Sequence, residues 1–100
     1  MYNMKSQILL VEDEPAVRQG TEQFLRQRGF AVLTATSGEE ALESFAGADV
    51  VILDIMLPGM SGIETLHQIR QTSDVPVLML TALHDEPTQV AALMNWRMTI

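Results

Sequence analysis

Acidic side chains follow two short apolar segments of this 100-residue chain, and a hydroxyl follows a third. The segment LLVEDE ends on Glu12, Asp13 and Glu14, the segment VVILD ends on Asp54, and Thr81 follows VPVLML. Carboxylates held a few ångströms apart repel each other, so one must be protonated or a cation must lie between them. An all-oxygen cluster without His or Cys selects a hard cation such as Mg²⁺. These segments therefore predict a cation site if the fold brings their ends together.

Each acid also has an ordinary structural interpretation, as the cap of the helix that follows it. Asp13 or Glu14, next to Pro15, suits that role as well as it suits a cation site. Asp54 does not suit it, because the next helix cap, Ser61, comes seven residues later. Asp54 is thus the acid whose position most needs a functional explanation.

Four short apolar segments alternate with helical patterns along the chain. The apolar segments are residues 8–11, 31–35, 50–53 and 75–80. Their nearly continuous hydrophobicity is typical of strands buried on both faces of a parallel sheet. Helical patterns begin at Pro15, at Ser37 and at Ser61, and a fourth covers residues 85–94. The alternation predicts a single α/β domain over residues 1–100, with three layers and a parallel sheet in the middle.

The spacing of apolar residues also predicts which side chains each helix turns toward the sheet. These are Val17, Thr21, Phe24, Leu25 and Arg28, then Ala41, Leu42 and Phe45, then Ile63, Leu66 and Ile69, and finally Val90, Leu93 and Met94. Gly29 is expected to end the first helix. In open α/β sheets, ligands bind at the carboxyl ends of the strands. The acids therefore meet in one crevice if the first, third and fourth strands are neighbours.

Composition excludes several classes of function. The formal net charge of −7 argues against direct binding of nucleic-acid phosphates. The absence of cysteine excludes disulfides and thiolate metal sites. No apolar run reaches the roughly 18 residues that a membrane span needs, and the N-terminal segment lacks a signal-peptide core. We therefore expect a cytoplasmic protein that does not enter the membrane.

Three motifs together carry a family resemblance over about residues 6–94. ILLVEDEPAVR, VVILDIMLPGMSGIETL and VPVLMLTA, in this order and at this spacing, resemble the receiver domain of two-component response regulators. The resemblance implies a flavodoxin-like sheet with strand order 2-1-3-4-5. It also implies that Asp54 is the phosphoacceptor and that a sensor histidine kinase is the partner that donates the phosphoryl group. A receiver of this kind is a regulatory phosphoacceptor domain rather than an enzyme.

The resemblance further assigns the residues around the phosphoacceptor. It implies a Mg²⁺ site in which Asp13 and Asp54 are ligands, Glu12 acts through water and the backbone carbonyl of Met56 is a third protein ligand. Thr81 matches the hydroxyl that binds the phosphoryl group. Ala82 matches the small residue that leaves room for that group.

The end of the sequence departs from the family pattern. The resemblance implies a fifth strand carrying a lysine and then a fifth helix, whereas Lys5 is the only lysine here. We therefore expect a truncated receiver of strand order 2-1-3-4, without the fifth strand and fifth helix, in which phosphorylation is impaired. Residues 94–100, MNWRMTI, are consistent with a one-nucleotide frameshift, and a deliberate truncation or a natural short form stays open.

Such a truncation predicts exposed apolar surface and hence self-association. The strand at 75–80 would become a free edge, and part of ILLV and VVIL would lie bare on one sheet face. We expect a homo-oligomer that covers these surfaces, with Trp96, Met98 and Ile100 in the interface. The alternative function is an inactive receiver remnant or interaction module that self-associates without phosphotransfer. Two enzyme classes are disfavoured, because the first strand is not followed by G-x-G-x-x-G and Met56 replaces the second acid of aspartyl-phosphate phosphatases.

Overall fold

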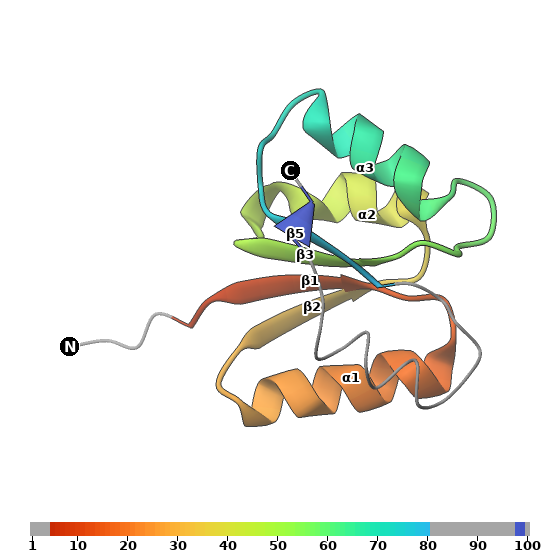
Figure 1. The fold of residues 1–100 in the computed structure, drawn as a ribbon. Helices are drawn as coiled ribbons and strands as arrows, with labels where there is room; N and C mark the ends of the chain where they lie inside the picture. The colour runs from red at the N-terminus through yellow and green to blue at the C-terminus, as the bar shows by residue number, and fades with distance from the viewer. Residues whose placement is uncertain (1–4, 81–97, 100) are drawn as a thin grey trace.

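The computed structural model describes residues 5–80, 98 and 99, whose strands and helices alternate as the sequence predicts (Figure 1). The strands are β1 (Gln7–Val11), β2 (Ala31–Ala35), β3 (Val50–Asp54), β4 (Val77–Leu80) and β5 (Met98–Thr99). The helices are α1 (Pro15–Gln27), α2 (Gly38–Ser44) and α3 (Gly62–Arg70), and α2 continues into a short 3-10 turn, η1 (Phe45–Gly47). The helix predicted at residues 85–94 lies outside the described residues.

The sheet has the strand order β2-β1-β3-β4 predicted for its parallel part. β1 lies between β2 and β3, so that Ile8 is opposite Val32 on one side and opposite Val50 on the other. Asp54 is opposite Leu80 at the end of the β3–β4 pair. The carboxyl ends of β1, β3 and β4 therefore lie side by side, which is the arrangement that the acidic site requires.

The outer edge of β4 differs from the prediction of a free edge. Met98 and Thr99 form a two-residue strand, β5, which pairs antiparallel with Leu78 and Val77. Met98, predicted to pack into an oligomer interface, thus pairs with β4 of its own chain, while Trp96 and Ile100 lie outside the described residues. Two residues can extend a sheet through backbone hydrogen bonds alone, and such pairing leaves no apolar pattern in the sequence.

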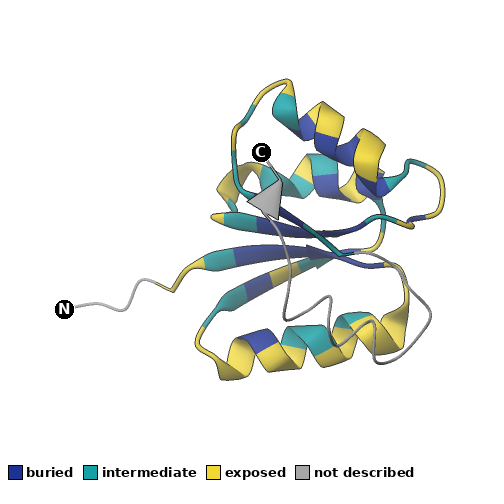
Figure 2. Cartoon of the chain, viewed as in Figure 1, coloured by how far each residue is buried: buried dark blue, intermediate teal, exposed yellow. Residues whose placement is uncertain are grey.

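The helices cover both faces of the sheet and close two separate cores (Figures 1 and 2). One core lies beneath α2 and α3 and contains Leu9, Val11, Val51, Leu53, Leu66 and Ile69 among its buried residues. The other lies on the face covered by α1 and contains Ile8, Leu10, Leu25, Val32, Ile52 and Leu78. The expectation of a bare face was wrong, since Ile8 and Ile52 are each only 5% exposed. Both belong to the same cluster of buried side chains as Leu25 of α1.

The predicted inward faces of the helices are correct only in part. Leu25, Leu66 and Ile69 are buried, whereas Phe24 is 50% exposed and Ile63 is 51% exposed. Val17 on α1 is similarly exposed. A helix that packs on a sheet buries a narrow stripe, and apolar residues at the margin of that stripe reach solvent. Phe24 is partly covered by the residue that ends its own helix, because the guanidinium carbon of Arg28 lies 4.1 Å from the ring centroid.

Local signals fix the ends of the helices as predicted. The hydroxyl of Ser37 accepts the N–H of Glu40 at 3.0 Å, and that of Ser61 accepts the N–H of Glu64 at 3.1 Å. Gly29 takes a positive φ of 94° just after α1, a conformation that glycine adopts at little cost. Within residues 5–80, no helix combines the length and apolar character that a bilayer crossing requires.

Candidate functional site

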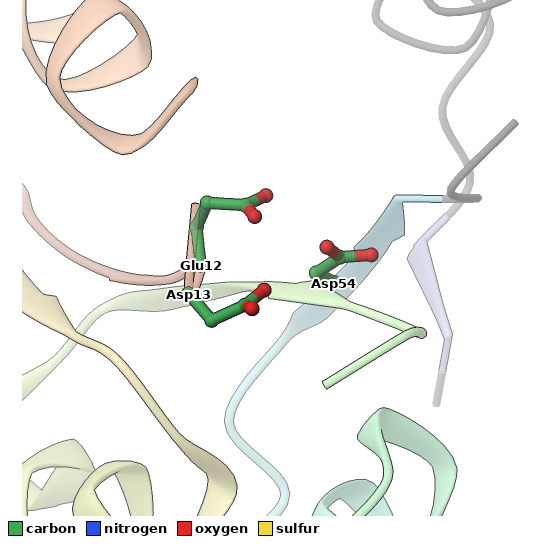
Figure 3. Close-up of side chains that lie close together, drawn as sticks. All are labelled: Glu12, Asp13 and Asp54. Carbon is green, nitrogen blue, oxygen red and sulfur yellow. The ribbon is translucent and has the colours of Figure 1, made fainter. Parts of the chain in front are cut away.

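Three acidic side chains predicted from the sequence meet at the carboxyl edge of the sheet (Figure 3). Glu12 and Asp13 follow β1, and Asp54 is the last residue of the neighbouring strand β3. One carboxylate oxygen from each of the three lies within 4.8 Å of the others. The parallel pairing of β1 with β3 causes this convergence, because it brings the ends of both strands to the same edge.

Glu12 is held by backbone groups on both sides. Its N–H donates to the carbonyl of Ala35 at 3.0 Å, which continues the β1–β2 pairing beyond the end of β1. Its Oε2 accepts the N–H of Glu14 at 3.1 Å. Glu14 in turn caps α1, since its Oε1 accepts the N–H of Ala16 at 2.9 Å. The capping interpretation therefore applies to Glu14, while the exposed Asp13 carboxylate belongs to the acidic cluster.

Asp54 is held by the loop that follows it. Its Oδ1 accepts the N–H of Met56 at 3.1 Å, and the next residue, Ile55, donates its N–H to the carbonyl of Leu80 at 3.1 Å. The first residue of α3, Gly62, then donates its N–H to the carbonyl of Ile55 at 2.9 Å. A Cβ on Gly62 would overlap the Asp54 carbonyl oxygen, so glycine is needed where α3 approaches the strand end.

Of the remaining predicted site residues, the structure describes Met56 but not Thr81 or Ala82. Met56 has a 59% exposed side chain, and its N–H contact with Asp54 brings its backbone beside the acidic cluster. Thr81 and Ala82 lie outside the described residues, directly after Leu80, the residue opposite Asp54 in β4.

Burial and mutual repulsion raise the affinity of the cluster for protons. Burial is the main reason that the pKa of Glu12 rises from 4.5 to about 7. The negative charges of Asp54 and Asp13 raise this pKa further, whereas the hydrogen bond from the Glu14 N–H lowers it. Burial also raises the pKa of Asp54, against the lowering effect of the Met56 N–H. Both residues are more than nine-tenths buried, at 6% and 7% exposed. Without a cation, a proton relieves part of their repulsion.

The donor set fits a hard divalent cation. Three carboxylates supply oxygen only, and Asp13 leaves the cluster open to solvent at one side. Mg²⁺ is usually bound by one or two carboxylates and keeps several waters, which suits a cluster at the edge of a sheet. A cation at this position would replace the bound proton and remove the repulsion between the three carboxylates.

One contact of the cluster was missed by the sequence analysis. Nη1 of Arg18, in the first turns of α1, donates to the backbone carbonyl of Glu12 at 3.0 Å and to that of Asp13 at 3.3 Å. The only available signal was the place of Arg18 at the end of the motif ILLVEDEPAVR. Every residue carries a backbone carbonyl, so a hydrogen bond to a carbonyl leaves no characteristic pair of residue types in the sequence.

Comparison with known proteins agrees with this geometry. The family described as the response regulator receiver domain matches residues 8–98. The sensory transduction protein RegX3 of Mycobacterium tuberculosis is 46% identical over 88 residues, which cover 86% of this chain and 39% of RegX3. This chain spans about two fifths of the length of the curated relatives that it matches.

Solved structures show the same fold with related sequences. The response regulator TrrA of Thermotoga maritima, in complex with Mg²⁺ and beryllium fluoride, is 37% identical with a TM-score of 0.74, and the match covers 88% of this chain and 79% of TrrA. TrrA in complex with the histidine kinase ThkA gives 37% identity and a TM-score of 0.73, with 88% and 78% covered. The sheet order, the acidic cluster at its edge and the matched family together show that this chain belongs to the response regulator receiver domains.

Proposed function

We propose that this chain accepts a phosphoryl group on Asp54 from a sensor histidine kinase, with Mg²⁺ bound at the acidic cluster. The observation that carries the proposal is the convergence of Glu12 and Asp13 on the buried Asp54, within 4.8 Å. Membership in the receiver family supports it, because receiver domains are regulatory phosphoacceptors. The solved complex of the relative TrrA with a histidine kinase supports the choice of partner.

The transfer follows from the chemistry of the carboxylate. An oxygen of Asp54 attacks the phosphorus, the bond between phosphorus and the histidine nitrogen of the kinase breaks, and that nitrogen keeps the electron pair and takes up a proton. The product is an acyl phosphate on Asp54. Asp13, Asp54 and the Met56 carbonyl, with Glu12 through water, would hold Mg²⁺, and the cation would supply positive charge that offsets the negative charge of the reacting groups.

The residues of this chain supply the positioning. The N–H of Met56 fixes one oxygen of Asp54, and burial keeps competing water away from its carboxylate. Thr81 is proposed to donate its hydroxyl to a phosphoryl oxygen, and Ala82 to leave space for that group. Lys5, the only lysine in the sequence, precedes β1 and so lies toward the opposite edge of the sheet from the acidic cluster; we therefore expect slow phosphorylation.

A small phosphodonor tests the proposal without the kinase. Incubation with acetyl phosphate and Mg²⁺ is expected to add one phosphoryl group, observed by intact mass, and Asp54→Asn is expected to abolish the addition. Asp74→Asn, which changes an exposed aspartate outside the cluster, serves as the matched control and should be modified like the wild type. Equal modification of the wild type and Asp54→Asn, or none in either, would leave the inactive interaction module as the better description.

We also propose that the chain forms a homo-oligomer and does not bind nucleic acid directly. The exposed apolar side chains of Val17 and Phe24 on α1 support self-association, and the net charge of −7 opposes contact with phosphate backbones. Self-association and the absence of nucleic-acid binding are properties of the outer surface and do not involve the phosphoacceptor site.

A further inference from the structure

Arg18 connects the acid-bearing loop to the helix that follows it. One guanidinium nitrogen, Nη1, binds two consecutive backbone carbonyls, those of Glu12 and Asp13, at 3.0 and 3.3 Å. The backbone N–H of the same residue donates to the carbonyl of Glu14 at 2.9 Å, which forms the first hydrogen bond of α1. Arg18 thus contacts three consecutive acidic residues through their backbone, without pairing with any of their carboxylates.

A series of hydrogen bonds within residues 12–18 joins the acid-bearing loop to the first turn of α1. The Glu14 N–H binds the Glu12 carboxylate, the Glu14 carboxylate binds the Ala16 N–H, and Arg18 binds the two carbonyls that precede Glu14. Two peptide groups whose carbonyls are tied to one guanidinium cannot rotate independently. Fixing these peptides fixes the directions of the Cα–Cβ bonds of Glu12 and Asp13 and so limits where their carboxylates can point.

The charge of Arg18 acts on a neighbouring helix as well as on the loop. Its positive charge lies on the backbone side of the loop, and Arg18 is half-buried. The same charge reaches Glu40 at the start of α2, where it adds to hydrogen bonds from the N–H and the hydroxyl of Thr36 in lowering the pKa of Glu40. The contacts that fix the guanidinium are therefore those with the carbonyls of Glu12 and Asp13, and its charge is felt at the start of α2.

We propose that Arg18 is a positioning residue, which holds the peptide groups of Glu12 and Asp13 so that both carboxylates face Asp54, and thereby sets the affinity of the cluster for a divalent cation. The inference rests on the proposed function in that it assumes the cluster binds Mg²⁺. It assigns Arg18 no contact with the cation or with the phosphoryl group. Partners that orient metal ligands from outside the first coordination sphere typically change metal affinity by about 10- to 100-fold when removed.

The direction in which Mg²⁺ affinity changes when Arg18 is removed distinguishes a positioning role from a purely electrostatic one. If Arg18 acted only through its charge, it would repel Mg²⁺, and its removal would tighten cation binding. If Arg18 positions the acids, its removal lets the loop move away from Asp54, and cation binding weakens. The two roles therefore predict changes of opposite direction in the same measurement.

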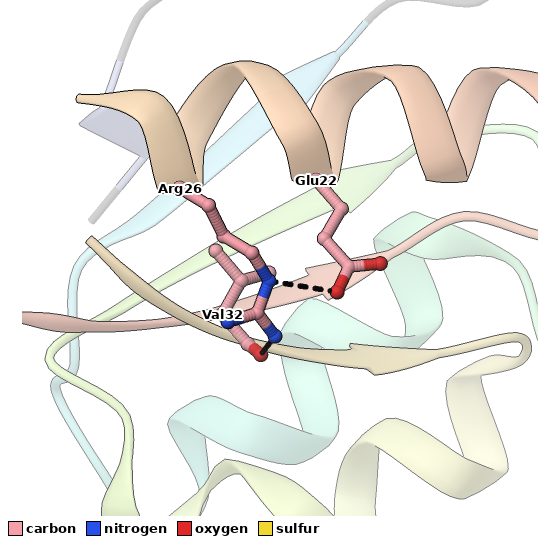
Figure 4. A network of polar contacts seen from close by, with 3 residues as sticks. All are labelled: Glu22, Arg26 and Val32. Atoms are coloured by element: carbon pink, nitrogen blue, oxygen red, sulfur yellow. Dashed lines mark hydrogen bonds and ion pairs between the residues drawn. The ribbon is translucent and has the colours of Figure 1, made fainter. Parts of the chain in front are cut away.

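Arg26 provides a matched control on the same helix (Figure 4). Its Nη2 donates to the backbone carbonyl of Val32 at 2.7 Å, and its Nε pairs with Glu22 at 2.9 Å. Arg26 therefore also ties a backbone carbonyl to α1, but away from the acidic cluster. Arg26→Met and Arg18→Met remove the same groups and keep the same aliphatic stem, so that a general loss of stability affects both variants.

The experiment measures Mg²⁺ affinity by calorimetric titration of the wild type, Arg18→Met, Arg18→Lys and Arg26→Met, together with urea unfolding of each. We expect Arg18→Met to weaken Mg²⁺ binding by about 10-fold, Arg18→Lys to recover most of that loss, and Arg26→Met to stay within about twofold of the wild type. Unchanged or tighter binding by Arg18→Met would overturn the inference. An equal loss in Arg26→Met, or a wild type that does not bind Mg²⁺, would also overturn it.

Phosphorylation in the same samples distinguishes this inference from the proposed function. With acetyl phosphate, Arg18→Met should require more Mg²⁺ for half-maximal modification of Asp54, while the rate at saturating Mg²⁺ stays near that of the wild type. If Mg²⁺ binding changes as expected but Asp54 is never modified, the phosphoacceptor proposal fails and the positioning role stands. If Asp54 is modified with the same Mg²⁺ dependence in Arg18→Met and the wild type, the positioning role fails alone.

Discussion

Glu12 is the residue whose protonation should couple most strongly to folding. Its pKa is about 7 in the folded chain without a cation, against an ordinary value of 4.5. Between these values the folded state binds more protons than the unfolded state, so the free energy of unfolding falls as pH rises. We expect a loss on the order of 2–3 kcal/mol between about pH 4.5 and pH 7.5, measured by urea unfolding with a chelator present.

Mg²⁺ should remove this fall in stability, because it binds the deprotonated cluster. With millimolar Mg²⁺ the free energy of unfolding should no longer fall through this pH range, and cation binding at about pH 6 should release protons into the buffer. Glu12→Gln removes the titrating group and serves as the control. A wild type and a Glu12→Gln variant with the same pH slope would show that another group carries the dependence.

Residue types at the site were predictable only where chemistry restricts the choice. Asp54 was identified because a carboxylate after a buried strand, with no helix to cap, has few structural uses. Arg18 was missed because it binds carbonyls, which every residue carries. Thr65 was also missed, although it is fully buried, since its hydroxyl is satisfied within α3 by the carbonyl of Ser61 at 2.8 Å. Such a local hydrogen bond makes a polar residue acceptable in a core without any apolar signal.

Two glycines in helices should respond to alanine in opposite directions. At Gly62, the first residue of α3, a Cβ would overlap the backbone at Asp54 and Ile55, and we expect Gly62→Ala to cost about 2–3 kcal/mol of stability. At Gly20, within α1, no atom lies within 4 Å of an added Cβ, and Gly20→Ala should add about 1 kcal/mol. Urea unfolding of both variants measures these effects.

The same two variants distinguish an effect on the acidic site from an effect on stability. Gly62→Ala forces α3 away from the strand end that carries Asp54, so Mg²⁺-dependent phosphorylation should fall even where the variant is fully folded. Gly20→Ala should leave phosphorylation unchanged. If Gly62→Ala is as stable as the wild type and is phosphorylated at the same rate, the close contact between α3 and Asp54 does not constrain the site.

The elements were predictable where a local pattern defines them. β2 has the predicted bounds, residues 31–35, and both serine caps start their helices as predicted. β5 was not predicted, because its two residues are a strand only through pairing with β4. The exposure of Phe24 could not be predicted either, since periodicity identifies an apolar stripe but not the width of the surface that covers it.

Assembly of the whole molecule should depend on the outer edge of β4. The carbonyl of Pro76 accepts a hydrogen bond from β3, and that of Leu80 accepts one from Ile55 just after β3. The alternating backbone groups of Val77 and Met79 therefore point to the outer edge. Among the described residues, pairing with β5 covers Val77 and Leu78 and stops there. We expect sedimentation at micromolar concentration to show species larger than the 11.1 kDa chain.

Met79→Pro tests the edge directly. Proline removes one outward N–H and is tolerated on edge strands, so the variant should keep the circular dichroism of the wild type and sediment as a smaller species. Phe24→Ser, which changes an exposed residue of α1, separates association through the helix from association through the edge. A wild type that sediments as a compact monomer and melts cooperatively would contradict the proposed self-association.

The central place of β1 in the sheet has a consequence for synthesis on the ribosome. β1 precedes β2 and β3 along the chain, yet Ile8 is opposite Val50, 42 residues later. At about 5–20 residues per second, β1 waits roughly 2–8 s for its second neighbour. During that time Glu12 and Asp13 have been synthesised and Asp54 has not, so the nascent chain has no acidic pocket. One side of β1 stays unpaired until β3 emerges, and a chaperone that binds extended apolar segments has those seconds in which to act.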